Sequence, residues 1–322
     1  MTDGAGIAET WLVGDIGATN ARFGLVSPER ELLHTHTFSI DEQPTIEHAI
    51  DAYLGERGSL PMPRQGAIAI ASAITGDRVA MTNHPWSFSI AALRHRLGLD
   101  RLEVINDFTA VALSLPYLGP EDRTAVGDGE AVPDAPIGVL GPGSGLGVSG
   151  LLRSGGTTVA LTGEGGHATM APSTERESAV LDRLRRQFDH VSAERVLSGP
   201  GLVNLYSALA GLDGVPSRGY TAAQITDAPM GSADSLCAEA TAMFCAMLGT
   251  VAGDLALTLG ARGGIYIAGG IVPRLGQRFA ASPFRQRFEA KGRFGTYLAA
   301  IPTHVVTQRF PAFLGCTALL AG

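Results

Sequence analysis

At 322 residues the chain is long enough for two domains of ordinary size, and 45% apolar residues with 42 glycines indicate a folded protein rich in tight turns. Its 24 basic and 31 acidic side chains give a net charge of −7 with no long basic cluster, which argues against nucleic acid as a partner. Three cysteines without CxxC spacing argue against a disulfide framework or a structural zinc site. Lys291 is the one lysine, which excludes a Walker A loop and a kinase-type strand lysine.

The first third of the chain predicts a sheet. Strand-like runs lie at residues 11–16, 21–26, 32–38, 67–74 and 102–105. Helical runs lie at residues 45–57, after the third strand, and 109–115, after the fifth. Short turns join the first three strands, so they are expected to be antiparallel neighbours. Three antiparallel strands, a crossover helix and then buried strands suggest a ribonuclease-H-like α/β lobe.

Residues 116–136 are rich in Pro, Gly and acid, which predicts a boundary or an exposed loop. A second sheet is predicted beyond it, again opening with hairpins, with strands at residues 137–140, 146–152 and 159–162. Thr174 and Glu177 have capping-box spacing at the start of a helix. A long buried helix, a strand and a short apolar segment follow, at residues 234–259, 265–268 and 311–320.

The predicted elements suggest a small lobe of residues 1–116 plus 309–322, onto which the last segment packs back, and a large lobe of residues 117–308. No signal-peptide pattern opens the chain. The most apolar helical run, residues 240–259, carries Asp254 and several small or hydroxyl residues. A soluble, unexported protein is therefore expected.

The first hairpin, VGDIGATNARFGLVS, concentrates polar groups in its turn. Small residues there let backbone amides approach phosphate oxygens, and a hydroxyl and a carboxamide add donors. Asp15 would repel a bare triphosphate, so it favours a divalent cation in between, held partly through water. The alternative is a plain hairpin in which Asn20 satisfies its own backbone.

Two further glycine-rich segments resemble ligand loops. GPGSGLG, at residues 141–147, lies between two predicted strands, although it lacks the Rossmann spacing. IYIAGGIVPR, at residues 265–274, is a buried strand that ends in two glycines, where a flat ring such as adenine can approach the backbone. The plainer alternatives are a hairpin corner and a strand-to-helix turn.

Polar residues that suit a ligand with hydroxyl groups come from both halves of the chain. Asn106 and Asp107 end a strand, where a carboxylate can accept the proton of a substrate hydroxyl; the alternative is a helix N-cap. Glu164 and His167 lie in GEGGH, and Glu194 lies in SAERVLSGPG. These side chains can hydrogen-bond a ring of hydroxyls, and the alternatives are metal ligands or surface loops.

The order of these motifs is that of the ATPase superfamily shared by actin, heat-shock chaperone ATPases and hexokinases. Within it, GDIGATNAR, AMTNHPWSFS, INDFTAVA, GPGSGLGV, GEGGHATMAP, SAERVLSGPGL and GGIYIAGGIVPR resemble the bacterial glucokinase family over nearly the whole chain. The resemblance implies a two-lobed actin-like ATPase fold with an interlobe active-site cleft. The repressor-and-kinase sugar family is disfavoured, because its cysteine-rich zinc motif is missing.

The resemblance also implies ATP-dependent phosphorylation of D-glucose at O6 by a cytoplasmic homodimer. Asp107 would be the general base, with sugar contacts from Asn106, Asp107, Glu164, His167 and Glu194. Phosphate contacts would come from Gly14, Asp15, Ile16, Gly17, Ala18 and Thr19 and from Gly143, Ser144 and Gly145, adenosine contacts from Gly269 and Gly270, and help with magnesium from Asp15.

Three positions depart from the family pattern. Ala18 stands where a second glycine is frequent, Ala73 where proline is usual, and Thr169 where aspartate is frequent. Ala18 should be tolerated if its φ is negative. The alternatives to a glucokinase are a kinase for another hexose, such as glucosamine or mannose, and a non-catalytic sugar or nucleotide sensor on the same fold.

Overall fold

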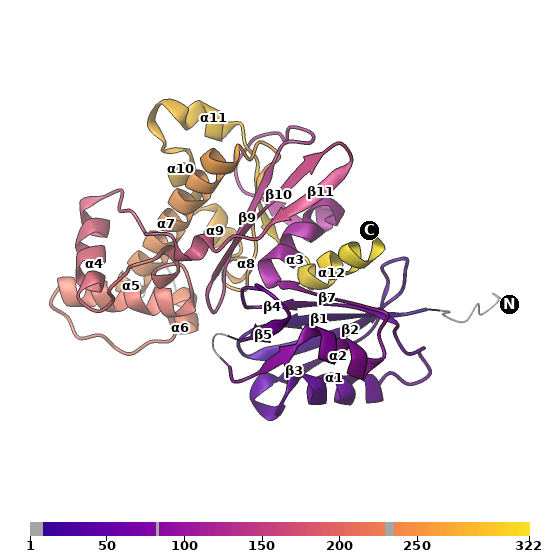
Figure 1. Ribbon diagram of the computed structural model, residues 1–322. Coiled ribbons are helices and arrows are strands. Elements are labelled where there is room, and N and C mark those ends of the chain that lie inside the picture. The colour runs from indigo at the N-terminus through magenta and orange to yellow at the C-terminus, as the bar shows by residue number, and fades with distance from the viewer. Residues whose placement is uncertain (1–8, 82–83, 229–234) are drawn as a thin grey trace. The chain divides into compact units, whose positions relative to one another are not determined.

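The computed structural model describes residues 9–81, 84–228 and 235–322, and its architecture is α/β (Figure 1). The chain divides into two compact units, Met1–Leu118 with Gln308–Gly322, and Gly119–Thr307. Thr82 and Asn83 of the AMTNHPWSFS motif lie outside the described residues, as does Asp234 at the predicted start of the long helix. Each unit is built around one mixed sheet.

The first unit contains a five-stranded sheet in the order β3-β2-β1-β4-β7. β1 pairs antiparallel with β2, and β2 with β3, which confirms the prediction for the first three strands; β4 and β7 run parallel to β1. The strands are β1 (Trp11–Ile16), β2 (Asn20–Val26), β3 (Leu32–Ser39), β4 (Gln65–Ile70) and β7 (Arg101–Asn106), and β5 (Arg78–Ala80) and β6 (Ser87–Ser89) form a separate hairpin.

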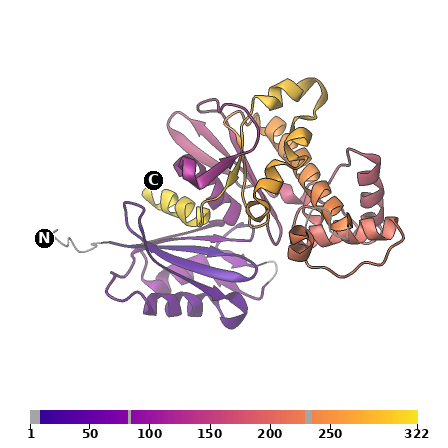
Figure 2. The same cartoon turned by 180° about the vertical axis from the view of Figure 1, so that it is seen from behind.

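Helices cover both faces of this sheet, as both views show (Figures 1 and 2). Residues alternate along β1: Leu12 and Ile16 pack on the α1 side, while Trp11 and Val13 pack against Phe313 of α12. The C-terminal segment thus packs on the first unit, as predicted. The helices are α1 (Ile46–Gly55), α2 (Ile90–Leu97), α3 (Asp107–Ser114) and α12 (Pro311–Ala321), with short 3₁₀ turns Ile40–Glu42 and Leu115–Tyr117.

The second unit repeats this strand arrangement, in the order β11-β10-β9-β12-β13-β8. β9, β10 and β11 form antiparallel hairpins, and β12 and β13 run parallel to β9. The predicted loop at residues 116–136 is partly wrong, because it contains β8, which pairs with β13 at the sheet edge. The strands are β8 (Arg123–Ala125), β9 (Ile137–Pro142), β10 (Leu146–Ser154), β11 (Thr157–Leu161), β12 (Ile265–Ile267) and β13 (Thr303–Val306).

Helices supply most of the core of the second unit. α7 is long and apolar enough to cross a membrane, with mean hydropathy 1.7 over its best window, but 61% of that window is buried. Met247 and Leu248 are fully buried in the core, so α7 is a core helix. The helices are α4 (Glu175–Arg185), α5 (Gly199–Leu212), α6 (Ala222–Asp227), α7 (Ser235–Leu259), α8 (Val272–Leu275), α9 (Gln277–Ala280), α10 (Phe284–Glu289) and α11 (Gly295–Ala299), with 3₁₀ turns η3 (Pro120–Asp122), η4 (Gly165–His167), η5 (Ala193–Arg195) and η6 (Gly292–Phe294).

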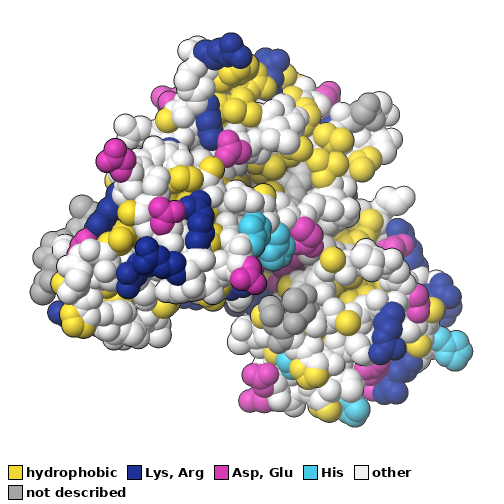
Figure 3. Space-filling view, turned by 60° about the vertical axis from the view of Figure 1, so that its left-hand side comes forward, with side chains coloured by type: hydrophobic (Ala, Val, Ile, Leu, Met, Phe, Trp, Pro, Cys, Tyr) yellow, Lys and Arg dark blue, Asp and Glu magenta, His cyan; other side chains and the backbone are white. Residues whose placement is uncertain are grey.

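Surface charge is mixed. On the face shown in Figure 3, arginine side chains are scattered among acidic, polar and apolar ones. This distribution is unlike the continuous basic stripe of a nucleic-acid-binding surface. Cys237, Cys245 and Cys316 are free thiols, and all three are buried.

Candidate active site

The β1–β2 hairpin forms a tight turn at one edge of the first sheet. The amide of Gly17 donates to the carbonyl of Asn20 at 2.9 Å, and the amide of Ile40 donates to the carbonyl of Thr19 at 3.0 Å. Thr19 and Asn20 are exposed. Among the described residues the non-glycine residues with positive φ are Arg30 and Asp134, so Ala18 sits in this turn without that strain. The turn leaves a hydroxyl and a carboxamide free to face a ligand.

Asp15, at the end of β1, forms an ion pair with Arg22 across the hairpin, with Nη1 3.0 Å from Oδ2. The Asp15 side chain is 29% exposed. Burial raises the pKa of Asp15 above its usual value, and the positive charge of Arg22 opposes that rise. Arg22 was not among the predicted site residues, although the register that places it opposite Asp15 follows from the hairpin pattern.

One carboxylate in this position fits magnesium. Mg²⁺ keeps several waters and is bound in nucleotide sites through one or two carboxylates plus substrate phosphates. Throughout residues 9–81, 84–228 and 235–322, no three His, Cys, Asp or Glu side chains gather as a metal cluster. A magnesium ion at this turn would take most of its ligands from phosphate oxygens and water, with Asp15 as one carboxylate beside it.

Asn106 and Asp107 lie at the same sheet edge as this turn. The parallel register aligns Ile16 of β1 with Ile70 of β4, and Ile70 with Asn106 of β7. Asn106 is the N-cap of α3, since its Oδ1 accepts the amides of Phe108 at 2.9 Å and Thr109 at 3.2 Å. The cap that the sequence offered as an alternative is therefore real for Asn106.

Asp107 occupies the first position of α3 and is half-buried. Its Oδ1 accepts the amide of Phe108 at 2.9 Å. A helix N-terminus favours a carboxylate over a carboxylic acid, because the free amides there carry partial positive charge. The fold thus holds Asp107 in a fixed place at the edge of the sheet, where it can accept a proton from a bound hydroxyl.

In the second unit, the β9–β10 turn takes the place that the β1–β2 turn has in the first. The amide of Gly143 donates to the carbonyl of Gly145 at 2.8 Å, and Ser144 is exposed. Gly269 lies against this turn with φ +82°, and a Cβ there would overlap the carbonyl of Pro142. The structure therefore brings the two glycine-rich segments together, which suits a phosphate chain on one and adenosine on the other.

Glu194 lies beside the same turn, and Glu164 and His167 lie on a neighbouring segment. Glu164 directly precedes η4 and His167 is its last residue; both are exposed, and the amide of His167 donates to the carbonyl of Glu164 at 3.0 Å. η4 is tied to η5, which carries Glu194, because the amide of Ala193 donates to the carbonyl of Ala168 at 2.8 Å. Glu194 and η4 therefore both lie at the start of β10, because Oε2 of Glu194 accepts the amide of Leu146 and a Cβ on Gly166 of η4 would overlap the carbonyl of Leu146.

Comparisons with known proteins confirm the resemblance to the glucokinase family. A family profile described as Glucokinase matches residues 12–322. The glucokinase of Paramagnetospirillum magneticum is 54% identical over 310 residues, which are 96% of this chain and 97% of that protein. The glucokinase of Aromatoleum aromaticum is 51% identical over 318 residues, which are 98% of this chain and 96% of that protein.

Solved structures place the fold in the same group. The crystal structure of a glucokinase from an Antarctic psychrotroph matches with a TM-score of 0.86 at 36% identity, over 97% of this chain and 98% of that one. This match confirms the predicted actin-like α/β class. With 54% identity to a glucokinase over almost its full length, the chain belongs to the glucokinase family.

Proposed function

We propose that this chain transfers the γ-phosphoryl group of ATP to the 6-hydroxyl of D-glucose, with Asp107 as the general base. The observation that carries the proposal is the position of Asp107, fixed at the first turn of α3 on the same sheet edge as the β1–β2 turn. Family membership supports the choice of ATP and glucose, because the similar proteins are named glucokinases.

In the proposed reaction the 6-oxygen of glucose attacks the γ-phosphorus while Asp107 accepts the hydroxyl proton. The bond from the γ-phosphorus to the bridging oxygen breaks, and ADP leaves. Asn106, Glu164, His167 and Glu194 bind sugar hydroxyls, which places the 6-hydroxyl for attack. Selectivity follows from the same hydrogen bonds, because a sugar that leaves one of these polar groups unpaired loses affinity.

Backbone amides of both glycine-rich turns, with Thr19 and Ser144, bind the phosphate chain, and Gly269 and Gly270 leave room for the adenosine. Magnesium bound with ATP supplies positive charge that lowers the cost of charge build-up during transfer. Asp15 is the residue that would help to hold it. Backbone amides and magnesium would thus supply the positive charge, so a chain with one lysine can transfer a phosphoryl group.

The test is glucose 6-phosphate formation by the wild type and by Asp107→Asn. We expect kcat to fall by about 10² to 10⁴, with the Kd for glucose little changed. Asp100→Asn is the matched control, because Asp100 is an exposed carboxylate at the other end of β7, paired there with Arg64. Equal kcat for the wild type and Asp107→Asn would contradict the assignment of the base.

A panel of sugars separates the alternatives. A higher kcat/KM for mannose or glucosamine than for glucose would make the chain a different hexose kinase. Sugar binding with no turnover on any member of the panel would make it a sensor. We also propose that the protein is a cytoplasmic homodimer, as the family resemblance implies; sedimentation velocity and fractionation of cells test the two parts.

A further inference from the structure

Glu194 contacts the glycine-rich β9–β10 turn directly. Its Oε2 accepts a hydrogen bond from the backbone amide of Leu146 at 2.8 Å, at the point where the turn enters β10. Glu194 lies so close to Gly145 that a Cβ on Gly145 would overlap Oε2. A residue with a side chain at position 145 would therefore displace the carboxylate or move the turn.

The segment that carries Glu194 also holds the other end of the turn. The amide of Gly199 donates to the carbonyl of Gly143 at 2.8 Å. Ser198 is 2% exposed, and its hydroxyl donates to the carbonyl of Glu194 at 2.8 Å. Both ends of the turn thus hydrogen-bond to a single short segment, and the shape of the turn depends on where that segment lies.

Only one oxygen of the carboxylate is committed to the turn. Within the described part of the chain, Oε1 of Glu194 accepts no hydrogen bond, and the residue is half-buried. The residues just before η5 are also joined to the segment that follows His167, because the amide of Met170 donates to the carbonyl of Val191 at 3.0 Å. One carboxylate oxygen thus holds the turn, while the other is available to a ligand.

We propose that Glu194 is a positioning residue for the β9–β10 turn and that it makes nucleotide affinity depend on the sugar. A sugar hydroxyl that donates to Oε1 restricts the rotation of the carboxylate. Oε2 then holds the amide of Leu146 in one place, so the turn is already ordered when the phosphates bind. Because the first ligand has met part of the ordering cost, the second binds more tightly. The inference rests on the proposed function, since it needs sugar and nucleotide on the same unit.

The magnitude follows from the size of the contact. Thermodynamic coupling between two sites is typically about 5- to 150-fold in affinity. The proposed coupling acts through one hydrogen bond and one carboxylate rotamer, so its size should lie at the low end of this range. We therefore expect glucose to tighten nucleotide binding about 5- to 10-fold. By reciprocity the nucleotide tightens glucose binding by the same factor.

Titration calorimetry with a non-hydrolysable ATP analogue and Mg²⁺, with and without glucose at ten times its Kd for each variant, tests this. In Glu194→Ala we expect the dependence on glucose to fall below twofold and the nucleotide Kd measured without glucose to rise about 3- to 10-fold. Glu194→Gln keeps an acceptor for Leu146, so its nucleotide Kd without glucose should stay within about twofold of wild type while its glucose Kd rises. If Glu194 only contacted the sugar, neither variant would change the nucleotide Kd measured without glucose.

Gly145→Ala is the second variant, because it pushes the carboxylate away from Leu146 without removing it. We expect it to reproduce the loss of coupling, with circular dichroism and Tm confirming that each variant is folded. The proposal is overturned if Glu194→Ala raises the glucose Kd but leaves the nucleotide Kd and the coupling unchanged. Coupled binding without turnover would contradict the proposed function alone, whereas turnover without coupling would contradict this inference alone; no glucose binding by the wild type would overturn both.

Discussion

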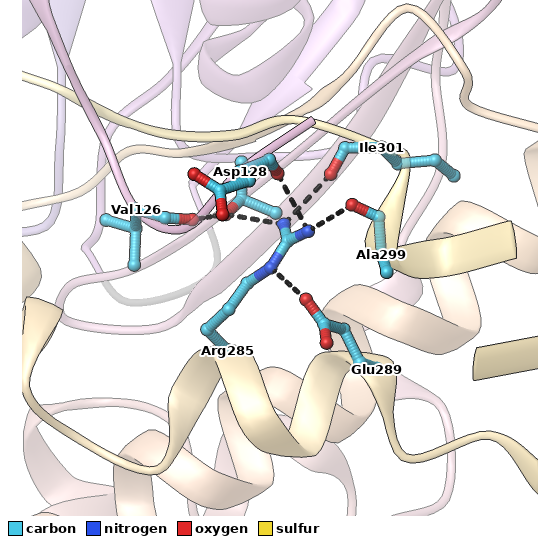
Figure 4. Close-up of polar contacts among 7 residues, drawn as sticks. Val126, Asp128, Arg285, Glu289, Ala299 and Ile301 are labelled. Carbon is cyan, nitrogen blue, oxygen red and sulfur yellow. Dashed lines mark hydrogen bonds and ion pairs between the residues drawn. The ribbon is translucent and has the colours of Figure 1, made fainter. Parts of the chain in front are cut away.

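Replacing Arg285 with alanine should destabilise the second unit by about 3 to 5 kcal/mol. The Arg285 side chain is 12% exposed, and its guanidinium lies among carbonyl oxygens from several segments (Figure 4). Nε pairs with Glu289 at 2.6 Å. The other bonds go to the carbonyls of Ile301 at 2.9 Å, Asp128 at 2.9 Å and Ala299 at 2.8 Å and to the hydroxyl of Thr303 at 3.2 Å.

The magnitude comes from what the alanine leaves behind. A hydrogen bond to a charged group contributes about 1.5 to 3 kcal/mol, and several are lost at once. Water can replace some of them, because Glu289 is 36% exposed and Asp128 lies near the surface. The expected loss of about 3 to 5 kcal/mol is therefore that of a buried ion pair that has lost one partner. It is smaller than the sum of the separate hydrogen bonds, because their contributions are not additive.

Urea unfolding followed by circular dichroism measures this loss as the shift in midpoint multiplied by m. Arg285→Lys should recover about half of it, because an ammonium keeps the charge but lacks the planar fork. Arg176→Ala is the matched control: Arg176 pairs with two carboxylates, one more than Arg285 among the described residues, but is 38% exposed, so its loss should be within about 1 kcal/mol. If Arg285→Ala loses no more than Arg176→Ala, the reasoning is wrong.

Three further predictions concern pH, the first hairpin and helix packing. Burial, reinforced by a nearby arginine, lowers the pKa of His304 to about 4. The free energy of unfolding should therefore fall as pH drops from about 6.5 to about 4, by less than the ~3 kcal/mol expected for a fully buried ring. Unfolding of His304→Gln measured against pH should show this dependence lost. Arg22→Ala should raise the pKa of Asp15 further, which moves the acid limb of the kcat/KM profile for MgATP to higher pH; an unmoved limb would contradict the role of Asp15. Gly315→Ala should cost at least about 1 to 3 kcal/mol in a thermal melt, because a Cβ there would overlap the carbonyl of Ala110 in α3, and a variant of wild-type Tm would show that the helices can separate freely.

Hairpins were the most predictable part of the fold. The alternation that predicts β1 to β3 is local, and the turns between them are short enough to fix the pairing. The strand predicted at residues 67–74 instead ends at Ile70, because the chain turns where the amide of Ser72 donates to the carbonyl of Ile70. β8 was missed because its exposed or half-exposed residues carry no pattern, and its partner Val305 is far along the chain.

The candidate site was predictable as residue types but not as contacts. Motif order named Asp107 and Glu194, whereas the bond from Leu146 to Glu194 spans 48 residues and depends on how η5 packs. Arg22 was missed for a different reason. Its position opposite Asp15 follows from a register that the hairpin pattern already contains, but an arginine on a strand is ordinarily read as a solvated charge.

The two sheets place a carboxylate beside a hairpin turn in two different ways. Each contains a hairpin whose turn can face phosphate, and each turn has a carboxylate beside it. In the first unit Asp15 belongs to the hairpin itself, and the positive charge of Arg22 opposes the rise of its pKa, which favours the ionised form that binds a cation. In the second unit the acid comes from η5 and accepts a hydrogen bond from the backbone amide of Leu146, at the start of β10. The first carboxylate is therefore suited to holding a metal, and the second to setting the shape of the turn, which is why removing Glu194 should change nucleotide binding before any chemistry takes place.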